Sequence, residues 1–128
     1  MTRLMSRKMM CVNFDEPDET RPFEGGMGRL DVIDTDNGPV GRAVFEPGWR
    51  WSQHVKPIAG TDSCEAAHTG YVISGRIKIV MDDGDALEAG PGDFVSVAPG
   101  HDAWVLGDTP CVVIDWVGYG TYAKPAGA

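Results

Sequence analysis

The sequence predicts an all-β fold, built as a sandwich or a barrel in a single domain. Short runs rich in valine, isoleucine, phenylalanine and tryptophan alternate with turn residues along most of the chain. Glycine (17 residues) and proline (9 residues) recur between these runs, and beyond Arg21 no long stretch carries apolar residues at helical spacing. A length of 128 residues is typical of one domain with one core.

The expected strands are bounded by glycine, proline, aspartate or asparagine, which favour turns. An Asp-Gly pair at Asp83 and Gly84 predicts a tight hairpin turn, because glycine adopts the positive φ that such a turn requires. The expected strands cover residues 28–34, 40–46, 70–74, 76–81, 85–89, 93–98, 103–107 and 111–117.

The N-terminal segment differs from the rest of the chain. Residues 1–23, with the acidic stretch "DEPDETRP", carry no core-forming pattern, so we expect an arm or an edge strand packed on the barrel or on a partner. Residues 24–122 are expected to form the barrel, and residues 123–128 a flexible tail. Pairing of two barrels would cover exposed strand edges, which predicts a homodimer.

Charge and cysteine content exclude several classes of partner. A net charge of −8 argues against nucleic acid, because binding to phosphates depends on basic residues. No apolar run is long enough to span a membrane, and the apolar residues after Arg7 and Lys8 end too early for a signal peptide. Three widely spaced cysteines favour a reducing compartment, so we expect a cytoplasmic protein that binds a small molecule.

The stretch "DSCEAAH" carries a candidate site. If residues 62–68 are extended, Asp62, Cys64 and His68 point to one face and Glu65 points to the other. The residues that continue the His68 face along the next strand are small or apolar, as in a barrel interior. A thiol, an imidazole and a carboxylate are therefore predicted to converge on that interior.

The other two histidines, His54 and His101, fall at predicted strand ends. The chain between His54 and His68 is long enough to turn and return antiparallel, and ligand sites collect at barrel mouths. Imidazole and thiolate together suit zinc, copper or iron. The ordinary alternative is a set of solvated loop histidines and an inert buried thiol. Cys111, within an apolar run, is expected to be such a buried thiol.

Two spaced motifs support the barrel. Gly48, five residues and His54 match the opening of one motif, and His68, six residues and Gly75 match its close. Gly92, five residues, "APG", two residues and Ala103 follow the frame of the second. Across residues 40–115 the sequence thus resembles the cupins, which are small β-barrel proteins of jelly-roll type. The resemblance implies a cupin-type jelly-roll barrel.

The chain departs from the cupin pattern at the metal positions. Lys56, His68 and Ala103 stand where the family has its second histidine, its glutamate and its last histidine. Read backwards from His68, the frame places Asp62 and Cys64 at the two histidine positions of the first motif. The expected metal is zinc, with iron, copper, nickel or manganese as alternatives. The expected ligands are His54, Cys64, His68 and His101, with Asp62 and Glu65 as substitutes.

Two functions are compatible with this sequence. The first is a small metal-dependent cupin enzyme, an isomerase, decarboxylase or oxygenase, acting on a small polar organic molecule in a pocket walled by Tyr71, Trp104 and Trp51. The second is a non-catalytic binding or sensor module with a structural metal or none. Three protein ligands would leave an open position for substrate, whereas four would close the site.

Overall fold

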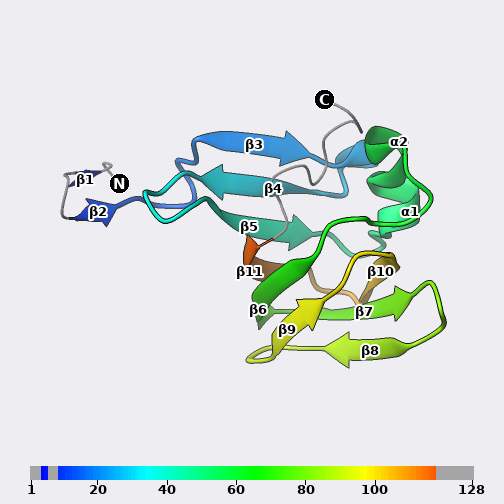
Figure 1. Ribbon diagram of the computed structural model, residues 1–128. Coiled ribbons are helices and arrows are strands. Elements are labelled where there is room, and N and C mark those ends of the chain that lie inside the picture. The colour runs from blue at the N-terminus through cyan, green and yellow to red at the C-terminus, as the bar shows by residue number, and fades with distance from the viewer. Residues whose placement is uncertain (1–3, 6–8, 118–128) are drawn as a thin grey trace.

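The computed structural model of this protein describes residues 4–5 and 9–117, and Figure 1 shows the arrangement of its strands. The tail expected at 123–128 and the end of the expected barrel lie outside the described residues. The all-β prediction is confirmed, because two antiparallel sheets form the body of the protein. None of the helices in the described part of the chain is long and apolar enough to cross a membrane.

The larger sheet has six strands and the smaller sheet has three. A short hairpin of β1 (Leu4–Met5) and β2 (Met10–Cys11) precedes them. The larger sheet runs in the order β3 (Glu19–Pro22), β4 (Gly28–Ile33), β5 (Val40–Phe45), β11 (Cys111–Val117), β6 (His68–Ser74), β9 (Phe94–Val97). The smaller sheet runs in the order β10 (His101–Leu106), β7 (Arg76–Met81), β8 (Ala86–Ala89).

Two glycines make connections that other residues would disturb. Gly75 links β6 to β7 as the chain passes between the sheets, with φ of 75°, and a Cβ there would clash with the backbone of Pro110 and Cys111. Gly84, with φ of 99°, ends the predicted hairpin turn between β7 and β8. The Met81 N–H donates to the Asp85 carbonyl at 2.7 Å across that turn. The hairpin prediction is confirmed.

Short helices occupy a segment where we expected none. The single-turn helices α1 (Trp51–His54) and α2 (Lys56–Ala59) lie at one end of the barrel, as Figure 1 shows, and a 3-10 turn, η1 (Glu24–Gly26), lies near α1. Proline in the first turn of α2 favours a helix start, and Gly60 ends it with φ of 76°. The expectation that the chain returns here as a simple antiparallel strand is therefore wrong.

The core lies between the two sheets and is apolar. Its largest fully buried side chains come from segments far apart in the sequence: Leu30, Trp49, Val55, Val72 and Cys111. Cys111 is fully buried and unpaired, as predicted, and burial raises the pKa of its thiol to about 12. That thiol therefore behaves as a small apolar side chain.

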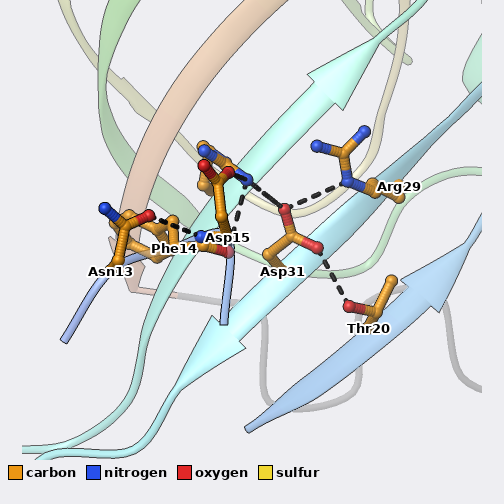
Figure 2. Close-up of polar contacts among 7 residues, drawn as sticks. Asn13, Phe14, Asp15, Thr20, Arg29 and Asp31 are labelled. Carbon is orange, nitrogen blue, oxygen red and sulfur yellow. Dashed lines mark hydrogen bonds and ion pairs between the residues drawn. The ribbon is translucent and has the colours of Figure 1, made fainter. Parts of the chain in front are cut away.

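A buried carboxylate ties the N-terminal segment to the outer face of the larger sheet, as Figure 2 shows. Asp31 on β4 is 2% exposed and accepts hydrogen bonds from the Thr20 hydroxyl at 3.0 Å and from Arg29 at 3.1 Å. Arg42 on β5 donates to Asp31 at 2.8 Å and to the Phe14 carbonyl at 3.3 Å. The segment before β3 is thereby attached to the sheet through Arg42.

Candidate metal centre

Backbone hydrogen bonds hold Cys64 beside the first residue of β10. The Cys64 N–H donates to the His101 carbonyl at 2.8 Å, and the His101 N–H donates to the Cys64 carbonyl at 3.4 Å. These bonds form an isolated antiparallel bridge between Cys64 and His101. The loop before β6 is thus fixed against the smaller sheet, while His68 begins the strand in the larger one.

Three donor side chains converge at this point from both sheets. The thiol of Cys64 and one ring nitrogen each of His68 and His101 all lie within 4.8 Å of one another. The Cys64 Sγ lies 3.5 Å from His68 Nε2, and the two imidazole centroids are 5.3 Å apart. Cys64 and His101 are 3% and 4% exposed. The residues fit a metal that accepts mixed sulfur and nitrogen ligands.

The other ring nitrogen of each histidine is held by a fixed acceptor. His68 Nδ1 lies 2.8 Å from the Asp115 carboxylate, and His101 Nδ1 lies 2.9 Å from the Ala98 carbonyl. Because a carbonyl and a carboxylate accept, each Nδ1 carries the proton, and each Nε2 is left for the cluster. Metal-binding histidines have this arrangement, which fixes the ring and the tautomer.

Asp115 was not a predicted site residue, although the sequence held a signal for it. On β11 the side chains of Cys111, Val113 and Asp115 alternate onto the buried face. A lone carboxylate at an inward position of such an apolar strand needs a buried partner. Here that partner is His68.

A cavity between the sheets adjoins the cluster. The volume of this cavity is about 70 Å³. His68, His101 and Asp115 lie in its wall, so the donor groups face both the buried Cys64 and the cavity. The rest of the lining is apolar or glycine: Leu30, Ala43, Phe45, Trp49, Trp51, Gly70, Val72, Ile77, Ile79, Val95, Val97, Ala103 and Val113.

Solved structures share this architecture. A double-stranded β-helix protein from Klebsiella pneumoniae is similar with a TM-score of 0.56 and 23% identity, covering 92% of this chain and 94% of that one. A DUF1255 protein from Acinetobacter sp. ADP1 is similar with a TM-score of 0.57 and 11% identity, over 78% of this chain and 90% of that one. The chain has the cupin fold.

A larger protein contains a region of similar fold. Oxalate decarboxylase from Lactobacillus farciminis is similar with a TM-score of 0.52 and 16% identity, covering 81% of this chain and 32% of that one. No protein-family model and no curated protein matches the sequence. The fold predicted from the two motifs is confirmed by the structural neighbours.

The cupin barrel leaves three of the predicted ligands away from the cluster. His54 lies on the helix α1 and not on the antiparallel strand that we expected to bring it to the cluster. Its Nδ1 accepts a hydrogen bond from a backbone N–H at 3.0 Å. Asp62 is exposed and lies 3.9 Å from the Lys56 ammonium. Glu65 is exposed and accepts a hydrogen bond from the Ser63 hydroxyl at 3.1 Å.

One of the three aromatic residues that we expected in the pocket wall, Trp51, lines the cavity. Tyr71 is 41% exposed on the outer face, because its neighbours Gly70 and Val72 point inward and successive strand residues alternate. Trp104 on β10 is half-buried outside the lining, with its ring under the Arg50 guanidinium, whose carbon lies 4.1 Å from the ring centroid.

The cluster shifts the acidity of its own members. Burial alone would raise the pKa of the Cys64 thiol, but hydrogen bonds and charge from His101 and His68 lower it to about 6. Burial alone would lower the pKa of His68, but its bonds to Asp115 and Cys64 outweigh burial and raise it to about 9. Both pKa shifts favour a Cys64 thiolate paired with a His68 imidazolium near neutral pH when no metal is bound.

The protonated His68 makes metal affinity depend on pH. Between about pH 6 and pH 9 a metal must displace the His68 proton, whereas Cys64 is already ionised, so one proton leaves on binding. We expect apparent zinc affinity to rise about tenfold per pH unit from about pH 7 and to level off above the His68 pKa of about 9. Competition with a chromophoric chelator measures this. A constant affinity over that range would contradict a protonated His68.

Replacing Asp115 with asparagine removes the charge that orients His68. We expect Asp115→Asn to weaken zinc binding by about 10- to 100-fold, as is typical for the partner of a metal-bound histidine. The matched control is Asp62→Asn, because that carboxylate is exposed and outside the cluster. Equal zinc affinities for the two variants, measured in the same chelator competition, would remove Asp115 from the site.

Proposed function

We propose that this chain is a metal-binding cupin whose ion is held by Cys64, His68 and His101. The observation that carries the proposal is the convergence of three donor atoms within 4.8 Å, with both histidines fixed through Nδ1. One sulfur and two nitrogen ligands suit zinc, and iron, copper, nickel or manganese are alternatives. Burial of Cys64 and His101 also supports the site, because it limits competition from solvent for these two donors.

The same arrangement supports a small metalloenzyme of the isomerase, decarboxylase or oxygenase type. Three protein ligands leave a position for water or substrate, and a bound metal would supply a Lewis acid there. His68 and His101 hold the ion at the cavity wall, and Asp115 fixes the His68 ring. The likeness to oxalate decarboxylase agrees with this proposal.

A binding or sensor module is the second candidate function. The burial of Cys64 and His101 favours it, since deeply buried ligands are typical of a structural metal. The two candidates differ in whether an added anion or thiol coordinates to the loaded metal. A change in the visible spectrum of the cobalt-loaded protein on adding azide would favour the enzyme, and no change would favour a site whose remaining position does not accept added ligands.

Elemental analysis of protein purified without an affinity tag tests the metal site. We expect close to one metal per chain in the wild type and in His54→Ala, and none in the double variant Cys64→Ser with His68→Ala. Absence of metal from the wild type, even after reconstitution with zinc, iron, copper, nickel and manganese, would contradict the proposed metal site. Circular dichroism of each variant checks that the barrel has formed.

We also propose that the protein is a cytoplasmic homodimer. Free cysteines at positions 11, 64 and 111 are in keeping with a reducing compartment.

The support for a dimer is a group of exposed large apolar side chains on β6, β9 and β11, of a kind that marks interaction surfaces. Sedimentation of the wild type and of Phe94→Glu tests it, and a monomeric wild type at micromolar concentration would overturn it. The group consists of Tyr71, Ile73, Phe94 and Trp116.

A further inference from the structure

The cavity beside the cluster is strongly asymmetric in polarity. Its polar side chains are His68, His101 and Asp115, and all three belong to the proposed metal centre or its support. The remaining lining comes from both sheets and from the segment that carries Trp49 and Trp51, and it consists of aliphatic, aromatic and glycine residues. A molecule in this cavity therefore meets polar groups at one end and hydrocarbon elsewhere.

The lining also lacks the groups that recognise charged or hydroxylated molecules. Among the described residues the lining contains no lysine or arginine, so no cationic side chain there balances a second negative charge on a ligand. In the part of the chain that the structure describes, the walls outside the cluster contribute no hydroxyl or amide side chain to pair with sugar-like hydroxyls. The indole nitrogen of Trp49 is buried and has no hydrogen-bond partner among the described residues, but surrounding atoms cover it.

The size of the cavity restricts the ligand further. Its volume of about 70 Å³ is roughly half that of an apolar cavity of about 150 Å³ that binds benzene. A short aliphatic group of a few carbons fits this space better than a ring with substituents. Burial of each additional methylene stabilises a complex until the space is filled.

We propose that the ligand of this site is a small, mainly aliphatic molecule with a single head group that binds the metal. This inference rests on the metal site proposed above and replaces the small polar molecule expected from the sequence. The head group reaches His68 and His101 at the polar end, and the aliphatic part packs against walls that include Val72 and Ile79. Dicarboxylates and hydroxy acids place a second polar group against these walls.

Short carboxylates test the proposal on protein already shown to carry one metal per chain. The cobalt-loaded protein is titrated with acetate, propionate, butyrate and pentanoate, and with malonate, succinate and lactate, while its visible spectrum is followed. We expect affinity to rise about fourfold per methylene until the cavity is full, and butyrate to bind at least about tenfold more tightly than succinate or lactate. Affinity independent of chain length, or tighter binding of succinate or lactate, would overturn the proposal.

Two variants of the wall separate this inference from the metal site. Ala43 lies on β5 in the cavity wall and is not a proposed ligand, so in Ala43→Leu metal content should stay near one per chain while butyrate affinity falls by at least about tenfold. Ile79→Ala enlarges the cavity by the volume of the side-chain carbons that it removes. The preferred chain length of the carboxylate should therefore increase by one or two carbons. Metal bound with unchanged carboxylate preference in both variants would overturn the ligand assignment alone. Failure of the wild type to bind metal would overturn both proposals.

Discussion

His68→Ala is expected to lower zinc affinity by more than about 100-fold, which exceeds the usual effect of changing only the partner of a ligand. The substitution removes a donor whose Nε2 lies 3.5 Å from the Cys64 thiol. It also leaves the buried Asp115 carboxylate without the imidazole that lies 2.8 Å away. Chelator competition measures the zinc affinity of the variant. We also expect the variant to lose its metal, about one per chain, during dialysis.

His54→Ala is the matched control, because both residues are histidines that the sequence marks as ligands. His54 lies on α1, outside the group formed by Cys64, His68 and His101. Its removal should leave zinc affinity within about twofold of the wild type, since surface changes away from a site have small effects. Equal losses in the two variants would contradict the assignment of the cluster.

Asp31→Asn is expected to lower the free energy of unfolding by about 2–4 kcal/mol. The substitution keeps the shape of the side chain but removes the charge that faces Arg42 and Arg29. Asp31 has 3% of its side chain exposed and Arg42 has 20%, so water replaces the lost charge poorly. Urea unfolding of the two proteins, compared at equal slope, measures the difference.

Asp15→Asn provides the comparison, because Asp15 also pairs with Arg42, at 3.1 Å, but its side chain is 78% exposed. An exposed ion pair contributes little, so this variant should lose less than about 0.5 kcal/mol. If Asp31→Asn costs no more than Asp15→Asn, burial of the carboxylate does not hold the N-terminal segment to the sheet as we describe.

Local rules were sufficient to predict most of the barrel. Turn residues separated apolar runs whose lengths suit strands, and the Asp83-Gly84 pair specified a hairpin that the structure contains. Alternation of side chains predicted that Gly70 and Val72 continue the face of His68, and all three line the cavity. These features depend on neighbouring residues alone, so a sequence carries them directly.

The site was predictable only in part, because it depends on contacts between distant segments. Residues 65–67 are not in a strand, so Cys64 does not reach His68 by the alternation we assumed. It reaches the cluster through a backbone bridge to His101 on the other sheet. No local pattern specifies such a bridge.

His54 and Asp115 show opposite failures of the same reasoning. His54 matched a cupin spacing, but two single-turn helices too short for a periodic pattern turned it away from the interior. Asp115 lay outside the motifs, yet its inward position on an apolar strand gives it a buried histidine partner. A motif therefore identified the fold more reliably than it identified the residues of the site.

X-ray absorption at the metal edge of the loaded wild-type protein tests the central claim most directly. For zinc we predict one sulfur at about 2.3 Å and two imidazole nitrogens at about 2.0–2.1 Å, with one further light atom. The sulfur should vanish in Cys64→Ser that has been reloaded with zinc. A shell of nitrogen and oxygen alone in the wild type would contradict a metal centre built on Cys64, His68 and His101.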